Sequence, residues 1–246
     1  MLRFPGVSVQ LQDPAWNGAR PPLDWLILAN RHSLVTRLLS ATVHDVNNTL
    51  QVVSGAAEVL AMDPTPEAVT KRTDSIVAQA RQATSVLHAL TAFARGTAPA
   101  AGGARPKAIA EYAVSLRLYA LRKARIAVTV SGDECPCAAS HGRVLQVLLN
   151  FLVNAEQALA GRAGATVGVR VQTTPAHVSI VVEDNGPGLV GGSDATFGAW
   201  PPKPGGAGRL GLGLLVSQAL AARDGGKASY APTPGGGASF VLWLPR

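Results

Sequence analysis

The sequence has few residues of the kinds that cross-link or anchor a chain: its 246 residues include 2 cysteines, 5% aromatic residues and 15% charged residues. The cysteines, Cys135 and Cys137, are separated by a single proline. A one-residue gap is poor geometry for a disulfide, and no His/Cys set with zinc-site spacing accompanies the pair. We therefore expect two reduced thiols in a cytosolic protein.

Long hydrophobic runs are also missing. No apolar stretch approaches the ~20 residues of a membrane-spanning helix. The first residues, MLRFPGVSVQLQDP, lack the continuous apolar core of a signal peptide. The sequence therefore predicts a cytoplasmic protein with no membrane contact.

Charge is present but dispersed. The formal net charge is +7, yet no run of Lys and Arg exceeds two residues. With so few aromatic residues beside these cations, nucleic-acid binding ranks last among the functions considered. A mild positive field suits ATP or an acidic partner surface equally well.

What the sequence does have is hydrophobic periodicity. Residues 1–22 are rich in Pro and Gly and form an irregular N-terminal arm, after which a helical pattern begins at Leu23. One heptad seam comprises Leu39, Val43, Val46, Leu50, Val53, Ala57 and Leu60. A second comprises Ile76, Ala80, Ala83, Leu87, Leu90 and Ala94. Between them, Pro64 ends one helix, and Thr65 and Pro66 suit the N-cap and first position of the next.

Two antiparallel helices that each carry an apolar seam cannot bury both seams by themselves. The simplest solution is a homodimer in which two hairpins form a four-helix bundle. Residues 23–96 are therefore predicted to be a helical-hairpin dimerisation domain.

A change of pattern follows the hairpin. Residues 97–106 are an Ala/Gly/Pro-rich linker, and residues 107–246 predict a mixed α/β domain. Helices are expected near 107–124, 140–160 and 210–224, and strands near 125–131, 165–173, 177–184, 227–231 and 238–244. Short turns between adjacent strands favour a mostly antiparallel sheet with the helices on one face.

The first helix carries an unusual polar group of residues. His44 lies one residue beyond a seam position, and Asn48 follows four residues later on the same face. An exposed neutral imidazole is a competent nucleophile near pH 7. The neighbouring carboxylate of Asp45 can hold the proton of one ring nitrogen, which leaves the other nitrogen free to attack phosphorus.

The segment HDVNN, residues 44–48, closely resembles the H-box of sensor histidine kinases. This resemblance implies that His44 is the phosphoacceptor and Asp45 its acid/base partner. It also implies that Asn48 takes part in dephosphorylating the partner protein.

A second polar pair lies on an apolar helix of the α/β region. Asn150 and Asn154 share one face of this helix, and two amides there are unfavourable unless they find partners. The segment resembles the N-box of the same family. That resemblance implies that Asn154 coordinates Mg²⁺ and that Asn150 supports the phosphates of ATP, and amide oxygens suit a hard cation.

A strand then runs into a glycine turn, VVEDNGPG at residues 181–188. A carboxylate at the end of a strand can accept a hydrogen bond from an exocyclic amine, while glycines let the backbone approach a flat base. The turn resembles the G1 box. This implies that Asp184 binds the adenine amino group, with Gly186 and Gly188 shaping the turn.

A glycine-rich run, GGAGRLGLGL at residues 205–214, opens the next helix. Free N–H groups at a helix start can cradle phosphate. Neither a Rossmann βαβ unit nor the Gly-Lys-Ser/Thr ending of a P-loop accompanies it. It resembles the G2 box, which implies phosphate contacts at Gly208, Gly211 and Gly213. The preceding segment resembles the family's lid, in which Lys203 reaches the phosphates.

The motifs together predict a helical hairpin followed by a Bergerat-type ATP-binding α+β domain. The expected activity is Mg-ATP-dependent phosphorylation of His44, with transfer to an aspartate on a response-regulator receiver domain. A sensory partner is expected to supply the input. Two alternatives remain: a non-catalytic phosphorelay or scaffold protein with a decayed ATP domain, and a Bergerat-fold ATPase or Ser/Thr kinase of the anti-sigma type.

Overall fold

The computed structural model describes residues 21–62, 65–96, 103–188, 210–233 and 236–246. In chain order the elements are α1 (Leu23–Met62), α2 (Pro66–Arg95), α3 (Pro106–Lys123), β1 (Ala127–Gly132), α4 (His141–Ala158), β2 (Thr166–Thr173), β3 (His177–Asp184), α5 (Leu210–Arg223), β4 (Lys227–Pro232) and β5 (Ala238–Pro245). Every helix and strand expected from the sequence is present, within a few residues of its predicted bounds.

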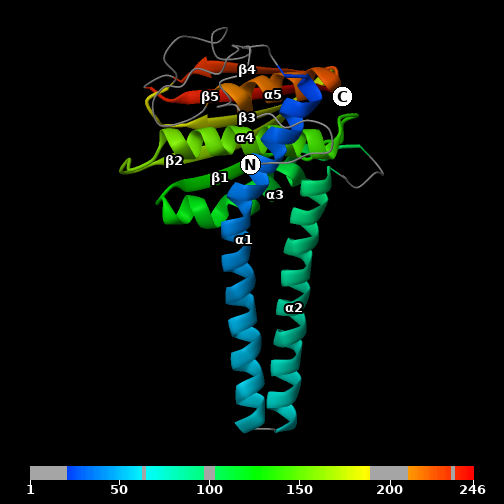
Figure 1. Cartoon of the computed structure of the whole chain (residues 1–246), viewed down its shortest axis with the longest axis vertical. Helices are drawn as coiled ribbons and strands as arrows, with labels where there is room; N and C mark the ends of the chain where they lie inside the picture. The colour runs from blue at the N-terminus through cyan, green and yellow to red at the C-terminus, as the bar shows by residue number, and fades with distance from the viewer. Residues whose placement is uncertain (1–20, 63–64, 97–102, 189–209, 234–235) are drawn as a thin grey trace.

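Helices α1 and α2 lie side by side as a long antiparallel hairpin (Figure 1). Pro66 occupies the first turn of α2, as predicted, because its missing N–H needs no partner there. Gly96 ends α2 in the left-handed conformation at φ 70°, and its N–H bonds to the carbonyl of Phe93. Such a glycine satisfies the open carbonyls of a helix end without a steric penalty.

The predicted seam of α1 faces away from α2 over much of its length. Leu39, Val43 and Leu50 remain 50%, 49% and 53% exposed. A neighbouring stripe is buried instead, and it includes Leu38, Ala41, Thr42, Thr49 and Ala56. The single hairpin therefore leaves an exposed apolar stripe along its side.

The C-terminal part of the chain is a five-stranded mixed sheet of order β1-β2-β3-β5-β4, covered by helices. Three of the four strand pairs are antiparallel, as expected from the short turns. The β1–β2 pair is parallel, because α4 carries the chain across between the two strands. We call this part, residues 103–246, the α/β lobe.

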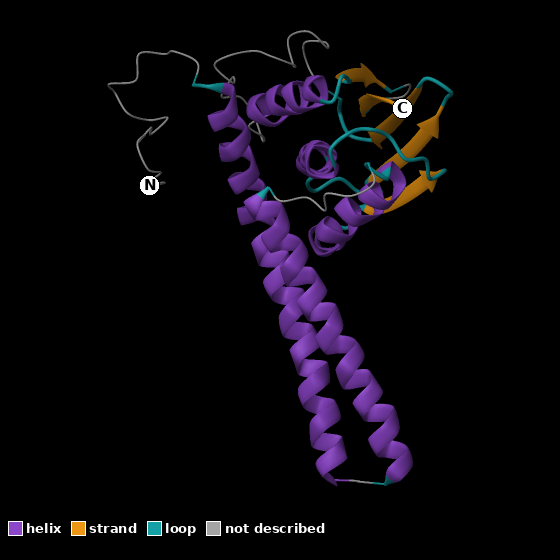
Figure 2. Ribbon diagram, turned by 90° about the vertical axis from the view of Figure 1, so that its right-hand side faces the viewer, coloured by secondary structure: helices purple, strands orange, loops and turns teal. Residues whose placement is uncertain are grey.

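The core of the lobe lies between the sheet and helices α3, α4 and α5. Alternate residues of β3 point into it, with Val178, Ile180 and Val182 fully buried. Residues 144–155 of α4 are all buried, because the sheet covers one face of the helix and other helices cover the rest (Figure 2). The N-terminal part of α1 crosses the outer side of this helical layer (Figure 1).

None of the described helices is long and apolar enough to cross a membrane.

Candidate functional site

His44 lies midway along α1 with 44% of its side chain exposed. Its Nδ1 is 3.0 Å from the amide nitrogen of Asn48 and 3.7 Å from Oδ1 of Asp45. The three residues that the sequence singled out on this helix therefore lie in one group.

Two partners compete for Nδ1 of His44, and they favour different tautomers. A hydrogen bond donated by the Asn48 amide requires Nδ1 to be an acceptor, which leaves the proton on Nε2. The carboxylate of Asp45 instead attracts a proton to Nδ1, which leaves the lone pair of Nε2 free. If the hydrogen bond of Nδ1 changed from Asn48 to Asp45, Nε2 would therefore become the nucleophile.

One face of the imidazole is covered by the α/β lobe. The ring of Tyr119, on α3, lies with its centroid 4.1 Å from that of His44 and is tilted by 31°. Offset ring contacts of this kind are stabilising. In this arrangement the histidine thus contacts α3, whereas those predicted nucleotide-binding residues that the structure describes lie on α4, on α5 and at the end of β3 or in the turn after it.

Asp184 ends β3 and is buried, with 5% of its surface exposed. Its Oδ1 accepts hydrogen bonds from the N–H groups of Gly186 at 2.8 Å and Ala238 at 3.3 Å. Its Oδ2 is buried and has no partner in the described part of the chain. Burial raises the pKa of Asp184 above its ordinary value, although the two backbone hydrogen bonds oppose this shift.

The orphaned Oδ2 fits the role implied for Asp184. A buried acceptor without a partner is unfavourable, and the exocyclic amine of adenine is a donor of the right kind. The turn after Asp184 also needs glycine. Gly188 has φ +75°, and a Cβ there would lie 2.9 Å from the carbonyl oxygen of Gly237.

Asn154 lies on α4 with 6% of its surface exposed. Its side-chain nitrogen is buried and has no partner among the residues that the structure describes, so it is a second orphaned polar group. The described residues contain no group of three or more His, Cys, Asp or Glu side chains that could hold a metal. The orphaned nitrogen is a donor and suits an acceptor such as a phosphate oxygen, whereas the amide oxygen of Asn154 is the atom that would coordinate a Mg²⁺ ion.

Asn150 has partners, unlike Asn154. Its Oδ1 accepts a hydrogen bond from Asn30 of α1 at 2.8 Å, and its amide nitrogen donates to Ser217 of α5 at 3.2 Å. Gln146, one turn earlier, donates to Oδ1 of Asn30 at 2.8 Å and to the Ile27 carbonyl at 3.0 Å. In this arrangement the Asn150 amide holds α1 against the lobe.

The glycines of the G2-like run lie partly within the described residues. Gly211 and Gly213 are in the first turn of α5. A Cβ on Gly213 would lie 3.2 Å from Oδ1 of Asn150, so this glycine lets α5 approach α4 closely. Lys203 and Gly208 lie outside the described residues.

Several residues of this region were not predicted from the sequence. Asn30, Gln146 and Tyr119 each bring α1 and the α/β lobe together. The available signal was weak: a single amide or phenol on a largely apolar helix. Their partners are over 100 residues away in the case of Asn30 and Gln146.

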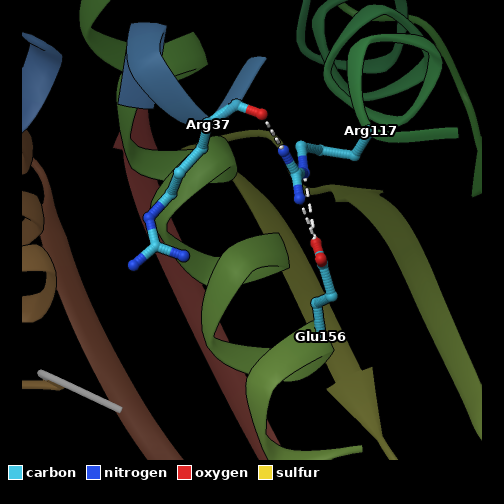
Figure 3. Close-up of polar contacts among 3 residues, drawn as sticks. All are labelled: Arg37, Arg117 and Glu156. Carbon is cyan, nitrogen blue, oxygen red and sulfur yellow. Dashed lines mark hydrogen bonds and ion pairs between the residues drawn. The ribbon is translucent and has the colours of Figure 1, made fainter. Parts of the chain in front are cut away.

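A buried arginine joins the same two parts of the chain (Figure 3). Arg117 of α3 pairs with the Glu156 carboxylate of α4, and its Nη1 donates to the Arg37 carbonyl of α1 at 3.1 Å. Only 5% of the Arg117 side chain is exposed, against 23% for Glu156. Removing one partner of a buried ion pair strongly destabilises a fold, because the remaining charge is left buried without a partner.

Replacing Arg117 with methionine is therefore expected to lower the free energy of unfolding by about 3 kcal/mol. Denaturant unfolding followed by circular dichroism measures this loss. The matched control is Arg170→Met, because Arg170 pairs with Glu183 at 2.9 Å with 50% and 35% of the two side chains exposed. The control should lose about 1 kcal/mol or less. Equal losses in the two variants would contradict the role given to the buried pair.

Comparisons with known proteins bear on this geometry. Residues 140–246 match the family model described as histidine kinase-, DNA gyrase B-, and HSP90-like ATPase. The chain is 25% identical over 230 residues to the C4-dicarboxylate transport sensor protein DctB of Rhizobium meliloti (strain 1021), covering 90% of this chain and 36% of DctB. It is 27% identical over 223 residues to the signal transduction histidine-protein kinase AtoS of Escherichia coli (strain K12), covering 88% of this chain and 36% of AtoS.

The chain is therefore similar to sensor histidine kinases over most of its length. It spans about a third of the length of the first two relatives it matches. Among solved structures, the catalytic domain of the histidine kinase ThkA matches with a TM-score of 0.51 at 20% identity, covering 57% of this chain and 93% of that domain. This likeness supports a Bergerat-type ATPase fold for the α/β lobe.

Proposed function

We propose that this chain binds Mg-ATP in its α/β lobe, phosphorylates its own His44 and passes the phosphoryl group to an aspartate of a response-regulator receiver domain. The observation that carries the proposal is the orphaned, buried Oδ2 of Asp184 at a glycine turn. This oxygen is an acceptor suited to the amino group of adenine. The same chain carries the exposed His44, which lies beside Asp45 and Asn48.

In the proposed reaction Nε2 of His44 attacks the γ-phosphorus in line with the departing ADP oxygen. Asp45 holds the proton on Nδ1 and stabilises the positive charge that develops on the ring. A Mg²⁺ ion held by Asn154 and the phosphates would neutralise the charge of the nucleotide. Asp184 anchors the base, so catalysis depends mainly on positioning and electrostatics.

The described arrangement corresponds to a resting state in this scheme. His44 contacts Tyr119 rather than the predicted nucleotide-binding residues, and Asn150 is bonded to Asn30. The reaction therefore requires the lobe to leave α1 and turn its nucleotide toward His44. The Ala/Gly/Pro-rich sequence of residues 97–106 suits such a movement.

Replacing Tyr119 with leucine should weaken this resting contact. Ring contacts of this kind contribute about 0.5–1.5 kcal/mol, so the initial rate of autophosphorylation should rise about 2- to 10-fold. The Tyr119→Phe variant keeps the ring and should phosphorylate at the wild-type rate. An unchanged or lower rate in the leucine variant would show that the stack does not restrain His44.

The exposed stripe of α1 supports the proposed homodimer. Leu50 is 53% exposed in the single chain and would be covered in a four-helix bundle. Leu50→Lys removes this apolar contact twice in a symmetric dimer and buries two charges, so the dimer dissociation constant should rise about 100-fold or more. Sedimentation equilibrium measures the change. Gln51→Lys adds the same charge at the next, exposed position and should leave the dimer intact.

The direct test is incubation with Mg-ATP that carries a radiolabelled γ-phosphate. The expected result is label on the protein that is lost in acid, kept in base and transferred to a purified receiver domain. Phosphohistidine has this behaviour, whereas a Ser/Thr kinase would yield acid-stable label. The absence of label from ATP, together with uptake of label from a phosphorylated receiver, would instead identify a phosphorelay protein.

A further inference from the structure

A cavity of about 410 Å³ lies where the hairpin meets the α/β lobe. All five helices contribute to its wall, and neither Asn154 nor Asp184 lines it. Its volume lies within the range of about 300–1,000 Å³ that is typical of small-molecule sites. The cavity is therefore separate from the predicted nucleotide site.

Most of the cavity wall is apolar. Ile27 of α1 and Phe93 of α2 face it from the hairpin, and Leu145 of α4 and Leu220 of α5 face it from the lobe. All four residues are at most 6% exposed. Such a wall favours a ligand with a hydrophobic body.

The polar part of the wall is positively charged. Arg143 pairs with the buried carboxylate of Asp224, and Arg223 pairs with Asp24. Arg31 bonds through Nε to Oε1 of Gln146 at 3.2 Å and has no carboxylate partner in the described part of the chain. Three guanidinium groups against two carboxylates leave one uncompensated positive charge, which a single negative charge on a ligand would balance.

A neutral donor lies in the same wall. The hydroxyl oxygen of Tyr112 on α3 is buried and has no hydrogen-bond partner among the described residues. Burial raises the pKa of Tyr112, so the phenol keeps its proton at neutral pH. A buried hydroxyl without a partner is unfavourable by about 1–3 kcal/mol, and an acceptor on a ligand would relieve this.

We propose that this cavity binds an organic monoanion with an apolar body, whose negative group accepts hydrogen bonds from Arg31 and the Tyr112 hydroxyl. Because hairpin and lobe both line the cavity, the bound anion stabilises the arrangement in which Asn30 holds Asn150 and Tyr119 covers His44. The anion would then inhibit autophosphorylation; this consequence rests on the proposed function.

Three probes separate the contribution of the negative charge to binding from that of the hydrophobic body. The first, 1-naphthylacetate, has both features. The neutral 1-naphthylacetamide has only the hydrophobic body, and acetate has only the charge. Isothermal titration of the full chain without nucleotide should show binding of naphthylacetate at least ~10-fold tighter than of either other probe. Saturating AMP-PNP, a non-hydrolysable ATP analogue, should not displace the probe competitively if the two sites are distinct.

Two variants test the assigned contacts. Arg31→Met removes the unpaired charge at similar length and should weaken naphthylacetate at least ~10-fold, whereas Arg81→Met, on an exposed part of α2, should bind as the wild type does. Tyr112→Phe should weaken binding of naphthylacetate about 5- to 10-fold. Without the probe, this variant should melt at the wild-type temperature or higher, because the substitution removes the unsatisfied hydroxyl. A merely structural role for Tyr112 would not produce both effects.

Equal affinity for naphthylacetate and naphthylacetamide, no binding of naphthylacetate at millimolar concentration, or wild-type affinity in both variants would overturn the proposal. Direct competition with AMP-PNP would do the same, by assigning the probe to the nucleotide site. These measurements do not depend on kinase activity, so the binding site can stand if the proposed function fails. Conversely, labelling of His44 that naphthylacetate leaves unchanged would remove the inhibitory role alone.

Discussion

Replacing His44 with alanine is expected to abolish transfer of radiolabel from ATP to the chain, with a loss of at least about 1,000-fold in the initial rate. The reason is chemical, since the variant lacks the nitrogen that forms the bond to phosphorus. The His44 side chain is 44% exposed on a helix, and alanine is the strongest helix former, so the fold should be retained. Filter binding or gel autoradiography at short times measures the effect.

The matched control for this experiment is His88→Ala. His88 is an exposed histidine on α2, the adjoining helix, and the sequence places no aspartate or asparagine within four residues of it. This variant should label at the wild-type rate. Nucleotide affinity should be unchanged in both variants. Acid-labile label that persists after His44→Ala would assign the phosphoacceptor to another residue.

Replacing Asp184 with asparagine is expected to weaken binding of AMP-PNP about 100-fold without destabilising the fold. The Oδ1 of asparagine can still accept from Gly186 and Ala238. Its amide nitrogen, however, would take the place of the orphaned Oδ2 and would present a donor to the adenine amine. Isothermal titration measures the affinity.

The stability of this variant follows from the raised pKa of Asp184. Because burial raises the pKa of the folded state, ionised Asp184 lowers the free energy of unfolding at neutral pH. That penalty disappears as the pH falls below the ordinary aspartate pKa, where the carboxyl is neutral in both states. Asp184→Asn should therefore melt at or above the wild-type temperature at pH 7, with any advantage lost in acid.

The control for Asp184→Asn is Glu183→Gln, the same chemical change one residue earlier. The Glu183 side chain is 35% exposed and pairs with Arg170. This variant should keep wild-type nucleotide affinity. A large loss of affinity in both variants, or a fall of several degrees in the melting temperature of Asp184→Asn, would argue against a specific adenine contact.

Much of the fold could be predicted because local patterns determine it. The heptad spacing marked α1 and α2, Pro66 marked the start of α2, and alternation marked strands such as β3. The parallel β1–β2 pairing was not predicted, because it depends on the path of α4 between the strands. The burial of Thr42 and Thr49 beside the seam also depends on how α2 packs against α1.

The candidate site likewise has residues that local motifs predicted and contacts that they could not predict. Local motifs identified His44 with its neighbours and the Asp184 turn, and the structure brings Asp45 and Asn48 to the imidazole. The contacts of Tyr119 with His44 and of Asn30 with Asn150 join distant segments, and no local pattern carries that information. The roles of these residues in binding and catalysis remain predictions.

The contact between α1 and the lobe has a consequence for its response to salt. Its buried part includes three uncharged amides, those of Asn30, Gln146 and Asn150. Its margin includes the ion pair of Arg223 with Asp24, whose side chains are 42% and 82% exposed. Mobile ions screen exposed charges strongly and barely affect buried neutral dipoles. Rising ionic strength therefore loosens the rim of this contact while its middle stays closed.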